Sequence, residues 1–170
     1  PRFGNYEILA QKSLGHGLGP LTILFFLGFK KDSSEVKSLL SFFKHYLIAR
    51  QLNDDAHDWG EDFKRGHITP VSTITLQKYV RKNKNSKKKI LLSVIIPQLQ
   101  ELFWHKTVVE ICHTIQKHTV LARKYLRALS IVVYPHVFEQ LLMSLDQSAK
   151  KALEERKDTL AFIDGYKNRV

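Results

Sequence analysis

Apolar residues recur every three or four positions along most of the chain, and this spacing places them on one face of an α-helix. The pattern predicts helices at about 36–63, 90–104, 106–132 and 136–163, the first of which can be one long helix. There is no internal repeat. The predicted fold class is therefore all-α, with residues 1–170 forming a single helical domain.

The first of these helices changes character along its length. Its apolar face is marked by Leu39, Leu40, Phe42, Phe43, Tyr46, Leu47 and Ile48. It is followed by five acids, Asp54, Asp55, Asp58, Glu61 and Asp62, whose offsets place them along one side of a helix. We call these five residues the acidic stripe.

Carboxylates at this spacing repel one another by a few tenths of a kcal/mol per pair in water, so a bridging cation would stabilise the stripe. Mg²⁺ is the natural candidate because it prefers oxygen ligands. An ordinary solvated helix face is the alternative. However, the chain has a net charge of +11 and only 16 acids, so five acids within nine residues are a concentration rather than background.

The residues around the stripe resemble the second aspartate-rich motif of class I isoprenoid synthases. Gln51, Asn53, Asp54, Asp55 and Asp58 are similar to the motif of trans-polyprenyl diphosphate synthases, although Arg50 stands where that family usually has phenylalanine. The continuation is closer to squalene and phytoene synthases, which match in register at Gln51, Leu52, Asp58, Gly60, Glu61, Asp62, Arg65 and Gly66. Asp54 and His67 replace the asparagine and arginine of that second pattern.

The resemblance implies a terpenoid-synthase-like helical bundle that ionises a prenyl diphosphate and then couples or cyclises the product. It implies Mg²⁺ as the cofactor, with Asp54, Asp55, Asp58 and Asp62 as its ligands. Asp54 and Asp58 are the expected catalytic carboxylates.

Four further residues are expected to bind the substrate. Lys12, followed by Ser13, resembles the Lys-Thr pair whose lysine faces the diphosphate in polyprenyl synthases, and is also expected to be catalytic. The resemblance assigns Gln51 to the same site. Lys64 and Arg65 follow the stripe and are suited to hold diphosphate, or else form an ordinary charged helix end.

Two neighbouring features have alternative interpretations. Gly15, Gly17 and Gly19 precede Pro20, and predict either a helix broken by small residues or a plain loop. His57 lies inside the acidic motif, where an exposed histidine that binds no metal is favoured over an acid–base catalyst.

The segment 78–89 contains seven Lys or Arg in twelve residues and predicts a solvated loop. An anionic membrane surface is its second interpretation, which would make the protein peripheral to a membrane. Nucleic acid is not favoured as a partner because no binding module accompanies the loop.

The single cysteine, Cys112, excludes an intrachain disulfide framework and a cysteine-based zinc cluster, so a cytoplasmic setting is the default. The uncharged stretch 14–29 is too short and too interrupted to span a membrane.

Class I synthases carry a first acidic motif well upstream of the second, whereas Asp32 and Glu35 are a poor substitute for it here. We therefore expect this chain to be the C-terminal part of a longer protein, or a half that needs a partner chain; a homodimer is also open. The competing functions are a non-catalytic homologue acting as a regulatory or scaffold subunit and, less favoured, a basic helical nucleic-acid-binding module.

Overall fold

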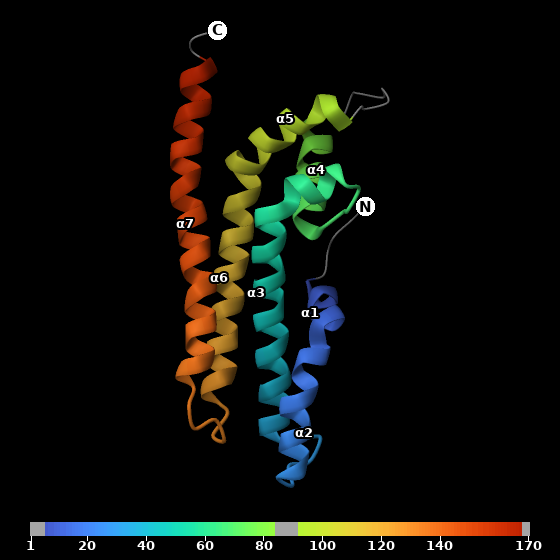
Figure 1. The fold of residues 1–170 in the computed structure, drawn as a ribbon, viewed down its shortest axis with the longest axis vertical. Coiled ribbons are helices and arrows are strands. Elements are labelled where there is room, and N and C mark those ends of the chain that lie inside the picture. Colours follow the sequence, from blue (N-terminus) through green and yellow to red (C-terminus); the bar gives the residue numbers. More distant parts are fainter. Residues whose placement is uncertain (1–5, 84–91, 168–170) are drawn as a thin grey trace. The chain divides into compact units, whose positions relative to one another are not determined.

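The computed structural model describes residues 6–83 and 92–167, and this part of the chain is helical without a strand. The elements are α1 (Glu7–Ser13), the 3₁₀ turn η1 (Leu14–Gly17), α2 (Leu18–Phe26), α3 (Ser34–Lys64), α4 (Pro70–Lys82), α5 (Leu92–Leu102), the π-helical segment η2 (Phe103–Thr107), α6 (Val108–Arg127) and α7 (His136–Lys167) (Figure 1). The all-α prediction is confirmed. Within the described ranges, no helix has the length and apolarity that crossing a membrane requires.

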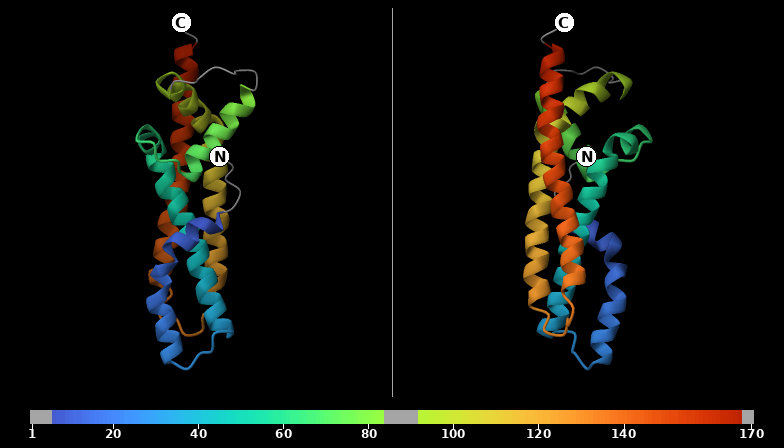
Figure 2. Two further views of the ribbon diagram at one scale, coloured as in Figure 1. Left: turned by 90° about the vertical axis from the view of Figure 1, so that its right-hand side faces the viewer. Right: turned by 60° about the vertical axis from the view of Figure 1, so that its left-hand side comes forward.

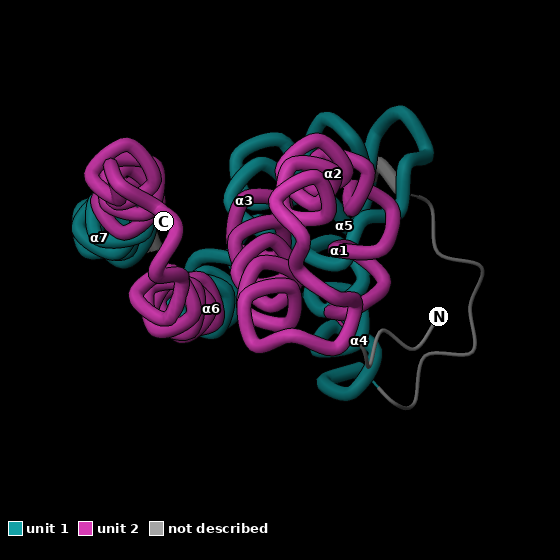
Figure 3. The backbone as a smooth tube through the Cα atoms, turned by 90° about the horizontal axis from the view of Figure 1, so that it is seen from below, with its two compact units in different colours: residues 1–4, 52–113, 149–170 teal, residues 5–51, 114–148 magenta. Residues whose placement is uncertain are grey.

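The chain forms two compact units (Figure 3). Unit 1 contains the described residues within 52–113 and 149–170, and unit 2 those within 5–51 and 114–148. The acidic stripe belongs to unit 1.

Unit 2 has an aromatic and aliphatic core built on the first part of α3. Phe42 packs edge-to-face on Phe138 of α7 at 5.4 Å between ring centroids, and stacks on Tyr46 at 6.0 Å. Leu47 and Ile48 are buried beside them, so the apolar face that the sequence predicted is the buried face. Hydrophobic burial on this face stabilises a helix that its own hydrogen bonds would leave marginal.

Within unit 2, α6 and α7 run side by side and are joined by the connection 128–135 (Figures 1 and 2). Arg123 of α6 ties them together through ion pairs with Glu139 at 2.9 Å and Asp146 at 2.6 Å. The helix that was predicted to reach residue 132 ends at Arg127. Leu129, in the turn after the helix, is also buried. The apolar spacing of the sequence therefore extends beyond the end of the helix.

Unit 1 gathers the last part of α3, α4, α5, η2 and the last part of α7. Trp59 of α3 stacks on Phe103 of η2 with 4.9 Å between centroids, and both side chains are buried. Thr75 of α4 donates a hydrogen bond to the Thr107 hydroxyl at 3.2 Å. These contacts hold α4 and the end of α3 against η2.

The π segment replaces a predicted break near residue 105. A π turn adds a residue to the helix and leaves carbonyl groups without their usual partners. Arg156 of α7 compensates, because its guanidinium donates to the carbonyls of Trp104 at 2.8 Å and His105 at 3.2 Å. A helix can therefore continue from α5 into α6.

The helix α4 was not predicted from the sequence. Thr69 caps it, accepting a hydrogen bond from the Ser72 amide while the Ser72 hydroxyl accepts one from the Thr69 amide, and Pro70 occupies the first turn. Residues 78–82 are thus helical, which corrects the predicted loop over 78–89. The remainder of that basic segment, 84–89, lies outside the described residues.

The glycine-rich stretch is a helical break rather than a plain loop. The turn η1 joins α1 to α2, and Gly17 is buried with the ring of Phe43 3.5 Å from where a Cβ atom would lie. The backbone at Gly17 thus packs against the ring of Phe43 at ordinary van der Waals distance.

Candidate functional site

The acidic stripe occupies the last three turns of α3, within unit 1. Asp54, Asp58 and Glu61 are exposed, and Asp62 is partly exposed. Asp54, Asp58 and Asp62 are spaced four residues apart on a regular helix, so they form one row along its surface.

Asp55 differs from the other acids because only 6% of its surface is exposed. It lies on the side of α3 that carries the buried residues Leu52, Trp59 and Phe63. A carboxylate in this position is held within the protein, whereas its neighbours face solvent. The five predicted acids therefore divide into four at the surface and one in the interior.

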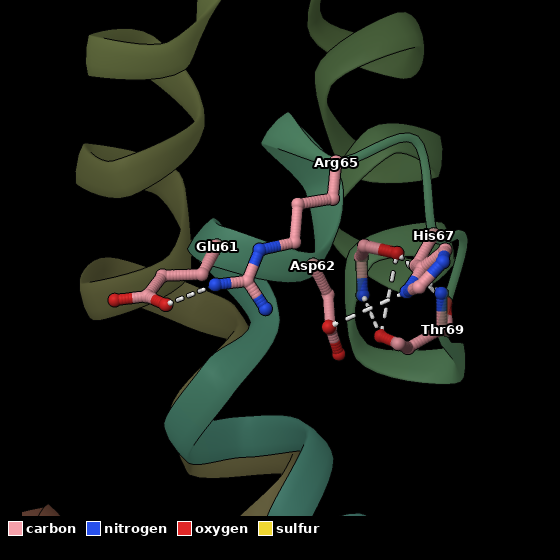
Figure 4. A network of polar contacts seen from close by, with 6 residues as sticks. Glu61, Asp62, Arg65, His67 and Thr69 are labelled. Atoms are coloured by element: carbon pink, nitrogen blue, oxygen red, sulfur yellow. Dashed lines mark hydrogen bonds and ion pairs between the residues drawn. The ribbon is translucent and has the colours of Figure 1, made fainter.

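At the end of the acidic stripe, Glu61 and Asp62 contact basic residues that follow α3 (Figure 4). Arg65 approaches Glu61 at 3.4 Å, one turn away, and the imidazole Nδ1 of His67 lies 3.8 Å from the Asp62 carboxylate. The second contact is an ion pair only when His67 is protonated.

Gly66 terminates α3 and brings His67 back toward the stripe. Its φ is +82°, a left-handed conformation that glycine adopts without strain. The His67 amide bonds to the Asp62 carbonyl at 2.8 Å, and the Gly66 amide to the Phe63 carbonyl at 3.1 Å. This pairing satisfies the last carbonyls of the helix.

The other predicted substrate-binding residues lie at several places. Lys64 and Arg65 are exposed at the end of α3, next to the stripe. Gln51 precedes the stripe on the same helix. Lys12 is exposed in the last turn of α1, in unit 2.

His57 is exposed, and its Nδ1 lies 2.7 Å from the Asn53 carbonyl, one turn back on α3. A carbonyl accepts only, so Nδ1 must carry the proton and donate. The exposure predicted for His57 is confirmed.

No group of three or more His, Cys, Asp or Glu residues in the described ranges converges closely enough to hold a metal ion. Magnesium sites that act on phosphates commonly use one or two carboxylates and complete the shell with phosphate oxygens and water. The exposed row of Asp54, Asp58 and Asp62 supplies carboxylates of this kind.

Unit 1 also contains a cavity of about 430 Å³ between α4, α5 and η2. Tyr79, Lys82, Gln98, His105 and Lys106 are among the residues that line it, and no residue of the acidic stripe does.

A histidine pair that no sequence pattern predicts lies in unit 2. The Nδ1 atoms of His45 and His118 are 2.9 Å apart, on α3 and α6, with Tyr125 stacked on His45 at 5.6 Å and Tyr6 edge-on to His118 at 6.3 Å. Burial, together with the nearby Lys44, lowers the pKa of His45. Burial, with the positive charge of His45 and Lys117 next in importance, lowers the pKa of His118 to about 4.

Cys112 is buried, and burial raises the pKa of its thiol to about 11. It therefore stays a neutral thiol at neutral pH, and it has no part in the candidate site.

Comparison with known proteins adds no assignment: no family model, curated protein or solved structure matches this chain. The candidate site consequently rests on the residues of α3 and their geometry.

Proposed function

We propose that this chain carries the second magnesium-binding motif of a class I isoprenoid synthase and takes part in ionising a prenyl diphosphate. The observation that carries the proposal is the row of Asp54, Asp58 and Asp62, four residues apart on the surface of α3. The terpenoid-synthase-like bundle is part of the same proposal.

The reaction breaks the bond between an allylic carbon and a diphosphate oxygen, and both electrons of that bond leave with the diphosphate. A magnesium ion bound there would neutralise the charge that develops on the departing group. Asp54 and Asp58 would contribute carboxylate oxygens to such an ion, as would Asp62 once freed from His67. The carbocation then couples with an alkene or cyclises.

In this proposal, Lys64 and Arg65 bind the diphosphate of the substrate. Both are exposed cations directly after the row of carboxylates, where they would bind diphosphate oxygens. The contact of Arg65 with Glu61 is an exposed pair separated by one turn, which is weak enough for a diphosphate to replace.

Mg²⁺-dependent diphosphate release from geranyl, farnesyl and geranylgeranyl diphosphates tests the function. We expect release that requires the metal and falls by at least about a hundredfold in Asp58→Asn. Asp158→Asn is the matched control, because Asp158 is also exposed on a helix of unit 1 but lies outside the stripe.

Release that Asp58→Asn leaves unchanged would contradict the assignment of the site. Absence of release from all three substrates, with the helical fold intact, would instead favour a non-catalytic homologue.

A further inference from the structure

The helix α2 is apolar around its whole circumference yet is largely uncovered. It has the sequence LGPLTILFF, and no acid, lysine or arginine occurs between Leu14 and Phe29. Helices of this composition are normally buried on all sides. Here Leu24 is buried, whereas Leu18, Ile23 and Phe26 are exposed, Phe26 to 88% of its full surface.

Polar groups along α2 and at its end are paired within the helix and the turn that follows. Thr22, its one polar side chain, donates a hydrogen bond to the Leu18 carbonyl at 2.8 Å. At its end the Gly28 amide bonds to the Phe25 carbonyl at 3.0 Å and the Phe29 amide to the Leu24 carbonyl at 3.1 Å, with Gly28 at φ +85°. These hydrogen bonds are kept when the exposed face of α2 leaves water.

A second exposed apolar segment lies at the same end of unit 2. In the connection 128–135, Val133 is 77% exposed and Tyr134 is 70% exposed. This connection and the one after α2 are at the same end of the unit in all three ribbon views (Figures 1 and 2). A cavity of about 200 Å³, lined by Leu27 and Val132 among others, confirms that the two segments are neighbours. We call α2 with the connection 128–135 the apolar end of unit 2.

The charges bordering this end are mainly positive. The segments 27–33 and 127–136 contain the exposed cations Lys30, Lys31 and Arg127 and the single acid Asp32, which gives three positive charges, one negative charge and a net +2. Exposed phenylalanine and tyrosine beside lysine and arginine are typical of surfaces that insert into the headgroup region of anionic membranes.

We propose that the apolar end of unit 2 docks on an anionic phospholipid surface, with α2 lying in the plane of the interface. A nine-residue helix is about 14 Å long, which is too short to cross the hydrocarbon core but sufficient to bury one face in it. Phe26 and Tyr134 enter the interface, and Lys30 and Lys31 contact lipid phosphates.

The charge pattern favours lipid over a second copy of the chain. A symmetric dimer through the same end would bring two surfaces of net charge +2 together, and like charges at an interface oppose association. Anionic headgroups instead neutralise Lys30 and Lys31. The proposal is independent of the acidic stripe and does not require synthase activity.

Cosedimentation with lipid vesicles tests the proposal. One set of vesicles is phosphatidylcholine alone, and the other contains about one third phosphatidylglycerol. We expect binding to the anionic vesicles to be at least about tenfold tighter and to weaken as salt is added.

Two variants identify the surface. The double variant Phe26→Ser with Tyr134→Ser should lose binding to both kinds of vesicle, whereas Phe162→Ser, which changes a phenylalanine that is 74% exposed in unit 1, should bind as the parent does. The double variant Lys30→Gln with Lys31→Gln should bind anionic vesicles no better than neutral ones. Its matched control is Lys150→Gln with Lys157→Gln, which removes two exposed lysines of α7 in unit 1.

Because the replaced side chains are exposed, circular dichroism should show an unchanged helix content in every variant. Vesicle binding that survives loss of Phe26 and Tyr134 would overturn the proposal, as would an absence of binding by the parent protein. Self-association of the parent that Phe26→Ser abolishes, without vesicle binding, would overturn it in favour of a dimer interface.

Discussion

His45 and His118 face each other across α3 and α6 with 2.9 Å between their Nδ1 atoms, so at least one of the two imidazoles is neutral in the folded protein. Two positive rings at that distance would repel strongly in a partly buried site. One ring donates its Nδ1 proton and the other accepts it.

This pair makes unfolding sensitive to mild acid. The pKa of His118 is about 4 in the folded protein and near 6.5 when unfolded, so the unfolded chain binds more protons between these values. The stabilising contribution is therefore complete above about pH 6.5 and is lost as the pH falls toward 4. In urea unfolding, the free energy of unfolding should be about 2 kcal/mol lower at pH 5 than at pH 7.5.

His118→Gln should remove most of that pH dependence. His113→Gln, an exposed histidine of the same helix, should leave it unchanged and serves as the control. An equal pH dependence in the parent and in His118→Gln would show that other groups cause it.

Arg123 should be a stability determinant of unit 2. Its guanidinium pairs with both Glu139 and Asp146, and all three side chains are partly buried. Arg123→Ala leaves two carboxylates without their cation, so the free energy of unfolding should fall by about 1–3 kcal/mol. Lys151→Ala, which breaks an exposed pair with Glu155, should change it by less than about 0.5 kcal/mol. Similar effects of the two substitutions would contradict this account.

Two glycines near the end of α3 should respond to alanine in opposite directions. Gly60 lies inside the helix with open space where a Cβ would be, so Gly60→Ala should stabilise by about 0.5–1 kcal/mol. Gly66 has φ +82°, so Gly66→Ala should destabilise by about 1 kcal/mol. Thermal unfolding of both variants checks the pair, and a change of the same sign in both would refute it.

Arg156 should hold the π segment. Replacing it with leucine keeps the apolar stem but leaves the carbonyls of Trp104 and His105 without this donor. We expect the free energy of unfolding to fall by about 1–2 kcal/mol and amide hydrogen exchange over Phe103–Thr107 to become faster. Lys157→Leu, on the next residue of α7, is the control. Unchanged hydrogen exchange in Arg156→Leu would show that Arg156 does not stabilise this segment.

Magnesium and inorganic diphosphate together should raise the melting temperature of the protein, because binding to the folded state alone stabilises it. At a hundredfold excess over the dissociation constant, the gain is about 2.7 kcal/mol, or several degrees. Asp58→Asn should abolish the shift, whereas Asp158→Asn should preserve it. A melting temperature that neither ligand changes would count against the proposed site without reference to turnover.

Most of the helices could be predicted from the sequence because helical periodicity is a local property. The face of Phe42 and Ile48 is buried as its spacing indicated. The helix α4 was also available from local signals, since Thr69, Pro70 and Ser72 form a helix start. The basic residues that follow them instead indicated a loop.

Residue spacing alone predicts a long helix at α3 with Asp54, Asp58 and Asp62 in a row on it, because both features belong to one element. Spacing does not predict that Asp55 is buried, that His45 meets His118 or that Arg156 reaches the carbonyls of η2. These relationships join residues far apart in the chain or depend on which side of a helix is covered. They are therefore set by how the helices pack, which no local pattern contains.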